Sequence, residues 1–198
     1  MPTQPVTEDL STVIDRAYSI GMLQKRAELL PFCEWLAPRK LKNYLEIGVW
    51  KGGSFSVWDS LSQPGLHIGI DPNTQPGIIL TPEQLATRQN LFATLKPVVC
   101  MLMMDSRRQS TIQALRDTLD GERLDLLFID GAHDQPFVHH DYVCYGQFVR
   151  PGGVIALHDI ALYPGCKTLW KDIRVHLLER REYIDTETPS GIGAIVTR

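Results

Sequence analysis

The 198-residue sequence has no apolar run approaching the roughly 20 residues that a membrane-spanning helix needs. Its polar N-terminal residues also lack the hydrophobic stretch of a signal peptide. An excess of charge is missing too, because the formal net charge is −3, so the composition gives no reason to expect nucleic acid or an anionic membrane as a partner. We therefore expect a cytoplasmic protein with no nucleic-acid and no membrane partner.

The four cysteines are widely separated, and no C-x-x-C pair occurs among them. This spacing is typical of reduced, mostly structural thiols in a cytosolic protein. Internal repeats, linkers and low-complexity stretches are missing as well, and a chain of this length fits one domain. We expect residues 1–38 to form a helical extension packed on the same domain as residues 39–198.

Strand patterns alternate with helical patterns along most of the chain, which indicates a parallel sheet with helical crossovers. The last two strand-like segments are joined by a link too short for a crossover, so they should form an antiparallel hairpin. The expected fold is an α/β Rossmann-like three-layer sandwich with a mostly parallel seven-stranded sheet. The predicted strands are 44–47, 67–70, 98–103, 124–129, 154–157, 183–187 and 192–197, and the predicted helices are about 7–19, 22–37, 54–61, 81–95, 110–119, 136–149 and 167–181.

Residues 44–55 have the pattern of a buried strand, a glycine turn and the start of a helix. This layout is typical of a nucleotide-cofactor site in a Rossmann-like sheet. The dinucleotide fingerprint G-x-G-x-x-G is missing, because Trp50 stands two positions after Gly48 and its bulk would obstruct a pyrophosphate. A nicotinamide-dependent oxidoreductase is therefore excluded.

Acidic residues end or follow the first five predicted strands. Open α/β sheets bind ligands at the carboxyl ends of their strands, so five acids in this register are expected to serve a common site. The acid after the second strand could accept both hydrogens of a ribose diol, although an aspartate before a proline can also initiate a turn. The five acids are Glu46, Asp71, Asp105, Asp130 and Asp159.

The pattern Glu46-x-Gly48-x-x-x-Gly52 resembles motif I of the class I S-adenosylmethionine (SAM)-dependent methyltransferases, whose cofactor has no phosphates. A second stretch carries Ile129-Asp-Gly-Ala-His133, a following helix, Pro151-Gly-Gly153 and a strand that ends on His158-Asp159. It resembles the methyltransferase branch that contains the macrolide-sugar O-methyltransferases and the cephalosporin-hydroxylase-like proteins. The resemblance covers about residues 40–160 and implies SAM as the methyl donor.

The resemblance also implies which residues bind the donor. Glycines in the first turn would let the backbone approach the methionine portion, although glycine there can also serve close packing alone. Glu46 would help to orient the methionine zwitterion. Asp105 would accept a hydrogen bond from the adenine amino group, but it could instead cap the following helix. The expected donor-binding residues are Glu46, Gly48, Gly52, Gly53, Ser54, Asp71, Asp105, Ser106 and Asp130.

Methyl transfer to an alcohol requires a base that removes the hydroxyl proton or a metal that raises its acidity. Metal-dependent relatives place acids after the fourth and fifth strands, where this chain has Asp130 and Asp159. Those relatives commonly present two adjacent oxygen side chains after the fifth strand, whereas this chain presents His158-Asp159. His158 could therefore be a base, a supporting group or a ligand for an ion other than Mg²⁺. One hypothesis places a divalent metal, Mg²⁺ or a similar ion, at Asp130, His158 and Asp159.

His133 lies three residues beyond Asp130, where the sugar O-methyltransferases of this branch carry their proposed general base. With an ordinary pKa of about 6.5, a histidine can take a proton at working pH and release it afterwards. A loop histidine could instead cap the helix that follows. The candidate catalytic residues are His133, Asp130 and His158.

The leading hypothesis is a SAM-dependent O-methyltransferase that acts on a hydroxyl of a small molecule, with a sugar moiety as the first acceptor to consider. The alternative is a non-catalytic or accessory protein on the same fold that binds an S-adenosyl ligand, because a fold does not fix an activity. An intact His133 beside Asp130 and Asp159 favours the enzyme. The sequence leaves open the identity of the acceptor and whether the chain forms a homo-oligomer.

Overall fold

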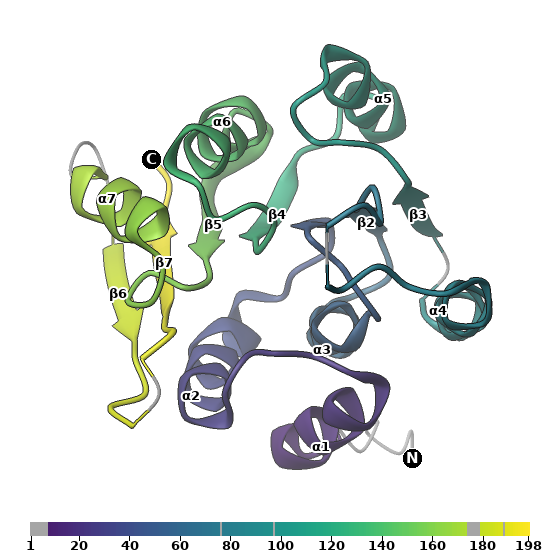
Figure 1. Ribbon diagram of the computed structural model, residues 1–198, viewed down its shortest axis with the longest axis horizontal. Coiled ribbons are helices and arrows are strands. Elements are labelled where there is room, and N and C mark those ends of the chain that lie inside the picture. The colour runs from purple at the N-terminus through teal and green to yellow at the C-terminus, as the bar shows by residue number, and fades with distance from the viewer. Residues whose placement is uncertain (1–7, 76, 97, 174–178, 188) are drawn as a thin grey trace, which may run out of the picture.

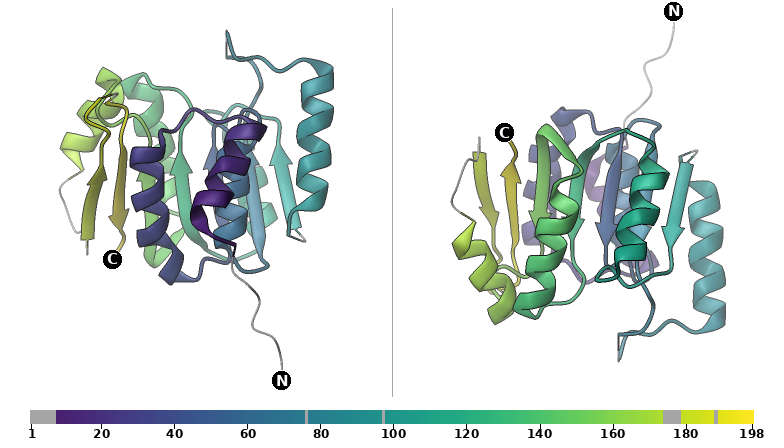
Figure 2. Two further views of the ribbon diagram at one scale, coloured as in Figure 1. Left: turned by 90° about the horizontal axis from the view of Figure 1, so that it is seen from below. Right: turned by 90° about the horizontal axis from the view of Figure 1, so that it is seen from above.

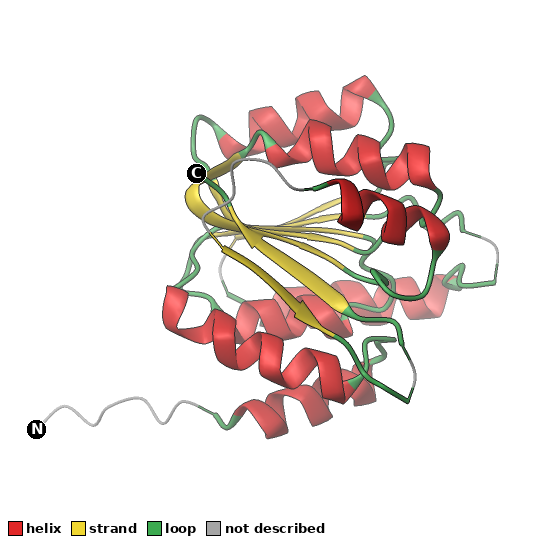
Figure 3. Cartoon of the chain, turned by 90° about the vertical axis from the view of Figure 1, so that its left-hand side faces the viewer, coloured by secondary structure: helices red, strands yellow, loops and turns green. Residues whose placement is uncertain are grey.

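The computed structural model describes residues 8–75, 77–96, 98–173, 179–187 and 189–198. Within them, a seven-stranded sheet lies between two layers of helices, as Figures 1 and 3 show. The predicted α/β three-layer sandwich with a mostly parallel sheet is therefore confirmed. Among the described residues, no helix is both long enough and apolar enough to cross a bilayer.

The strands of the sheet are β1 (Tyr44–Ile47), β2 (Leu66–Ile70), β3 (Val98–Leu102), β4 (Leu124–Ile129), β5 (Val149–Leu157), β6 (Glu179–Tyr183) and β7 (Ile192–Val196). They lie in the order β3-β2-β1-β4-β5-β7-β6. The first five strands run parallel to one another, and β7 runs antiparallel to both β5 and β6. The predicted antiparallel pairing of the last two strands is confirmed.

The helices are α1 (Leu10–Ile20), α2 (Arg26–Leu36), α3 (Gly53–Leu61), α4 (Pro82–Thr94), α5 (Gln109–Leu119), α6 (Gln135–Gly146) and α7 (Pro164–Asp172), with a 3-10 turn at Ala37–Arg39. Helices α1 to α4 lie on one side of the sheet and α5 to α7 on the other (Figures 1 and 2). Each side has its own cluster of buried apolar side chains. The two N-terminal helices contribute to the first cluster, so they are part of the folded core.

The centre of the sheet positions the candidate site. Strands β1 and β4 are neighbours, and Ile47 of β1 pairs with Ile129 of β4. From β1 the strand order proceeds to β2 and β3 on one side, and from β4 to β5 on the other. The loops that follow β1 and β4 therefore lie side by side at the point where the order reverses, which is where open α/β sheets bind ligands.

Strand β5 begins earlier than predicted. The predicted helix over 136–149 ends at Gly146, and β5 starts at Val149 rather than at Val154. Residues 151–153, the Pro-Gly-Gly segment, lie inside β5 at a register shift that separates the pairs Leu124–Val149 and Leu126–Val154. Proline and glycine are tolerated where a bulge interrupts the ladder, so the predicted start of this strand at residue 154 was wrong.

The end of the chain also differs from the prediction. Helix α7 ends at Asp172, and residues 179–183 form β6, so the predicted helix to 181 and strand at 183–187 were wrong there; residues 174–178 lie outside the described residues. Glutamate and arginine have high helix propensity, so this charged run gives no strand signal. Pairing of Arg181 with Ala194 of β7 decides the structure instead. Charged side chains also suit an edge strand because they discourage pairing with another chain.

Candidate active site

The turn after β1 packs directly on the chain that follows β4. Gly48, Trp50 and Gly52 have positive φ angles of 88°, 46° and 93°. Glycine adopts such a backbone without steric cost, whereas tryptophan rarely does. A Cβ atom on Gly48 would lie 2.5 Å from the carbonyl carbon of Asp130, and Asp130 donates its backbone N–H to the carbonyl of Ile47 at 2.8 Å. The predicted donor-binding turn and the candidate catalytic Asp130 therefore form one wall.

Glu46 and Ser54 lie beneath this turn. Glu46 is fully buried, and its Oε1 accepts a hydrogen bond from Ser54 Oγ at 2.5 Å. Its Oε2 makes no hydrogen bond of normal geometry with any residue that the structure describes, although the indole of Trp58 is near enough to lower the Glu46 pKa. Burial dominates and, with the charges of Asp130 and Asp71, raises the pKa of Glu46 well above its usual value. Glu46 is therefore a buried acid without a cationic partner among the described residues.

Asp71 links the end of β2 to the same turn. Its Oδ2 accepts the backbone N–H of Trp50 at 2.7 Å, and its Oδ1 accepts that of Asn73 at 2.6 Å. Arg88 of α4 lies 3.7 Å from Oδ2 and donates to the carbonyl of Trp50 at 2.7 Å. Asp71 thus organises the turn, and each of its oxygens retains a further lone pair for another donor.

Asp105 and Ser106 lie further out, after β3. The carboxylate of Asp105 pairs with the guanidinium of Arg107, whose Nε donates to Oδ1 at 2.8 Å. This bond lowers the pKa of Asp105 to about 2. The backbone carbonyl of Ser106 accepts a hydrogen bond from Tyr145 at 2.6 Å. The structure therefore connects these two residues to their own loop and to α6 rather than to the Gly48–Gly52 turn.

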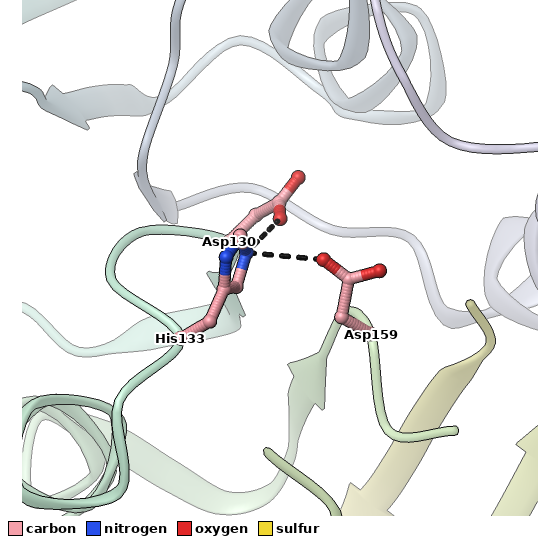
Figure 4. Close-up of side chains that lie close together, drawn as sticks. All are labelled: Asp130, His133 and Asp159. Carbon is pink, nitrogen blue, oxygen red and sulfur yellow. Dashed lines mark ion pairs between the residues drawn. The ribbon is translucent and has the colours of Figure 1, made fainter. Parts of the chain in front are cut away.

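Asp130, His133 and Asp159 converge beyond the ends of β4 and β5 (Figure 4). His133 Nε2 lies 3.0 Å from Asp159 Oδ2 and 3.8 Å from Asp130 Oδ1. One ligand atom from each residue lies within 4.8 Å of the other two, so the three could hold a metal ion. His133 Nε2 is buried, yet within the described part of the chain it makes no hydrogen bond of normal geometry, even to the nearby Asp159 oxygen. Two carboxylates and an unsatisfied imidazole nitrogen form a donor set that fits a divalent cation.

Two features fix the position of this group. The ring of His133 stacks on that of Tyr163, with centroids 4.1 Å apart and an interplanar angle of 5°. Asp159 has a φ angle of 61°, in the left-handed region that residues other than glycine seldom adopt. Such conformations concentrate at functional sites, where the surrounding structure enforces them. The Asp159 carboxylate is therefore held in place by its backbone as well as by its contacts.

His158 is connected to an acid that the sequence patterns did not reveal. Its Nδ1 lies 3.0 Å from Asp130 Oδ1, and its Nε2 lies 2.9 Å from Oε1 of Glu28 on α2. Glu28 is completely buried and also accepts hydrogen bonds from Ser190 Oγ at 2.7 Å and from the backbone N–H of Gly191 at 2.5 Å. Both nitrogens of His158 are therefore engaged by carboxylates, and Glu28 joins α2 to the loops after β5 and before β7.

Gln24 is a second contact that the sequence patterns missed. It lies between α1 and α2, is only 3% exposed, and donates a hydrogen bond from Nε2 to Asp130 Oδ2. No motif marks Gln24 or Glu28. The one signal in the sequence was the predicted helical extension over residues 1–38, which was expected to pack on the same domain as the site.

The charges in this cluster alter one another. Burial opposes a charge on His133, but Asp130 and Asp159 outweigh it and raise the pKa of His133 to about 9. Burial likewise opposes a charge on His158, and Asp130, Asp159 and Glu28 hold its pKa well above the usual value. Burial would raise the pKa values of the three acids, yet all three are lowered: His133 and His158 lower those of Asp130 and Asp159, and His158 lowers that of Glu28. The site is therefore a compact set of paired opposite charges at neutral pH.

An open surface pocket of about 620 Å³ lies at the opposite ends of the strands. One of its three acids, Asp125, accepts hydrogen bonds from the backbone N–H groups of Lys42 and Asn43, both at 2.8 Å, and from Nε of Arg150 at 2.5 Å. These bonds hold the start of β4 to the segment before β1 and to the bulge of β5. We assign the pocket a structural role and place the functional site at the carboxyl ends.

Comparison with known families gives a consistent picture. A family model described as a methyltransferase domain matches residues 45–160. Among curated proteins, the uncharacterized protein R132 of Acanthamoeba polyphaga mimivirus is 30% identical over 120 residues, which are 61% of this chain and 52% of that protein. The chain therefore spans about half the length of the curated relative that it matches.

Solved structures share the fold across nearly the whole chain. The O-methyltransferase from Bacillus cereus, in complex with S-adenosylhomocysteine (SAH), superposes with a TM-score of 0.62 at 16% identity and covers 100% of this chain and 93% of its own. The O-methyltransferase TomG from Streptomyces achromogenes, bound to SAM, gives 0.61 at 18% identity, with 99% and 92% covered. The methyltransferase MycE, with Mg, SAH and mycinamycin VI, gives 0.63 at 16%, with 96% and 55% covered. At these identities the likeness shows the fold, and the match of the family model confirms the resemblance to methyltransferases that was predicted from the sequence.

Proposed function

Since the chain belongs to this methyltransferase-domain family, we propose that it is a SAM-dependent O-methyltransferase acting on a hydroxyl of a small molecule. The observation that carries the proposal is the position of His133. Its ring lies against Asp130 and Asp159, and Asp130 is in backbone contact with the Gly48–Gly52 turn. A proton-accepting side chain therefore adjoins the turn that would hold the donor.

The donor would lie along the carboxyl ends of β1, β2 and β3. Its methionine portion would lie along the Gly48–Gly52 turn, which Gly48 brings close to Asp130, because any side chain at Gly48 would collide with residue 130. Asp71 stands beside the same turn with acceptor positions for the ribose hydroxyls. Asp105 and Ser106 would then meet the adenine, after the Asp105–Arg107 pair on their exposed loop has rearranged.

The acceptor hydroxyl would lie next to His133. Methyl transfer from a sulfonium is an in-line displacement, so the hydroxyl oxygen, the methyl carbon and the sulfur must be collinear. Tyr163 keeps the His133 ring in one plane, and Asp130 and Asp159 keep its nitrogen at the junction of the two subsites. With a pKa of about 9, His133 must first release its own proton before it can take the proton of the acceptor.

A divalent cation also fits this group of residues. Asp130, Asp159 and His133 would hold it, because His158 already directs both nitrogens at carboxylates and would have to leave one of them to become a ligand. When bound, such a cation would take over the positive charge of the His133 proton and increase the acidity of an acceptor hydroxyl. His158 then serves as a donor that orients Asp130.

Calorimetry with SAH tests the donor half of the proposal. The purified protein should bind SAH, and Asp71→Ala should weaken binding, whereas Asp117→Ala, at an exposed position on α5, should not. Turnover is then followed as SAH production from SAM with hydroxylated sugars and glycosides as the first acceptors, with and without EDTA. Binding of NADH without any S-adenosyl ligand would overturn the proposal, and full activity in EDTA would remove the metal from it.

A further inference from the structure

The link between α1 and α2 lies over the donor-binding turn. The carbonyl of Gly21 accepts the backbone N–H of Gly53 at 3.2 Å, and a Cβ atom on Gly53 would lie 2.6 Å from the carbonyl oxygen of Ala17. Further along the link, the carbonyl of Gln24 accepts a hydrogen bond from Tyr18 at 2.9 Å. The end of α1 and the link are therefore packed on the start of α3, which positions Gln24 beside Asp130.

The side-chain amide of Gln24 can point only one way. The NH₂ group of the amide donates to the carboxylate of Asp130, which as an acceptor could not receive the amide oxygen, so that oxygen is directed elsewhere. That oxygen, Oε1, is buried and has no hydrogen-bond partner among the described residues. A buried carbonyl oxygen without a hydrogen bond is destabilising, so a ligand that donates a hydrogen bond to it would be favoured.

A second buried oxygen, Glu46 Oε2, also has no hydrogen-bond partner among the described residues. The charge of Asp130 contributes to the raised pKa of Glu46, so a positive charge placed between these two acids would be stabilised. The surroundings of the turn thus contain two oxygens without a partner and the carboxylate of Asp130. An ammonium group brings a positive charge and three hydrogens, so it satisfies several such acceptors at once.

We propose that Gln24 is a donor-binding residue whose Oε1 accepts a hydrogen bond from the α-ammonium group of SAM. The inference rests on the proposed function and adds to it a residue from outside the matched segment 45–160. It also gives the N-terminal helices a role, because their link supplies part of the donor site.

The geometry favours the ammonium group over a metal ion. The oxygens of Asp130 point apart in Figure 4, one toward His133 and the other away from it. The oxygen near His133 is Oδ1, and the one that Gln24 contacts is Oδ2. Gln24 therefore approaches Asp130 at the oxygen that does not face the candidate metal ligands.

A double-mutant cycle between protein and ligand tests this contact. Calorimetry gives the dissociation constants of SAH and of its analogue without the α-amino group, for the wild type and for Gln24→Met, which keeps the side-chain length and loses the oxygen. Loss of the amino group should weaken binding to the wild type about tenfold more than to the variant, which corresponds to about 1.4 kcal/mol. In Gln89→Met, an exposed substitution on α4, loss of the amino group should weaken binding by the same factor as in the wild type.

The assignment would be overturned if removal of the α-amino group weakened binding by the same factor in the wild type and in Gln24→Met. Electron paramagnetic resonance measures Mn²⁺ binding to the same proteins. If that factor is equal and Gln24→Met also loses affinity for Mn²⁺, the Gln24 oxygen belongs to a metal site and the assignment to the ammonium group is overturned. If circular dichroism shows that Gln24→Met does not fold, Gln24→Ala takes its place in the same cycle. A wild type that binds no SAH refutes the proposed function itself, which separates that failure from this one.

Discussion

The close approach of Gly48 to Asp130 predicts an unusually harmful glycine-to-alanine substitution. Gly48→Ala adds a methyl group at a φ angle of 88° and places it 2.5 Å from the carbonyl carbon of Asp130. The backbone there cannot move away easily, because β1 and β4 pair up to Ile47–Ile129 and the N–H of Asp130 is bonded to Ile47. The substitution should therefore destabilise the protein and also separate the two halves of the candidate site.

Gly121 is a matched control for the backbone angle. It has a φ angle of 85°, and a Cβ atom added there would have nothing within 4 Å. Gly121→Ala should cost about 1–2 kcal/mol, the usual penalty for a side chain in the left-handed region. Gly48→Ala carries the same penalty plus about 1–3 kcal/mol for overpacking, a total of about 2–5 kcal/mol. The difference between the two variants isolates the contact with residue 130.

Urea denaturation followed by circular dichroism measures both free energies of unfolding, and calorimetry measures SAH binding. Gly48→Ala should be less stable than Gly121→Ala and should lose SAH binding, while Gly121→Ala should bind SAH like the wild type. Equal free energies of unfolding for the two variants would refute the reasoning, because the clash with residue 130 would then add nothing to the cost of the backbone angle.

Two further predictions concern single side chains. Glu46 has a pKa raised above its unfolded value, so its contribution to stability is complete below about pH 4.3 and declines as the pH rises. The stability of Glu46→Gln should therefore increase relative to that of the wild type as the pH rises, when both free energies of unfolding are measured by urea denaturation. A difference between the two that does not change with pH would contradict the raised pKa. His133→Ala should reduce turnover about 10²- to 10⁴-fold if His133 is the base. His139→Ala, exposed on α6, should change turnover little, and a similar small loss in His133→Ala would leave it only a structural role.

Much of the site could be predicted because it follows from topology. Parallel strands joined by helices place their carboxyl ends at one edge of the sheet, so residues that end strands are brought together. Asp130 follows β4 and Asp159 follows β5, and their carboxylates lie 3.8 Å and 3.0 Å from His133 Nε2. Asp105 is the exception, since Arg107 two positions later pairs with it. A strand-end rule gives the position of an acid but not the partner that its side chain selects.

The contacts from the N-terminal helices could not be predicted in the same way. Glu28 and Gln24 lie in or beside helical patterns whose apolar residues indicate only that one face is buried. Where such a helix docks depends on the shape of the sheet and on packing against other helices. The bond between Glu28 and His158 spans 130 positions of sequence, and no local pattern in either segment refers to the other.

Glu28 offers a physical reason for the histidine at position 158, where metal-dependent relatives commonly carry an oxygen side chain. Glu28 and Asp130 approach the same side chain from two directions, at 2.9 Å and 3.0 Å. An acid at position 158 would place three carboxylates together with no hydrogen to share, and like charges that close destabilise one another. An imidazole instead donates to both, provided that it carries two hydrogens, which agrees with its raised pKa. The buried acid on α2 and the histidine after β5 are therefore two halves of one arrangement, and neither could change alone without leaving a buried charge unpaired.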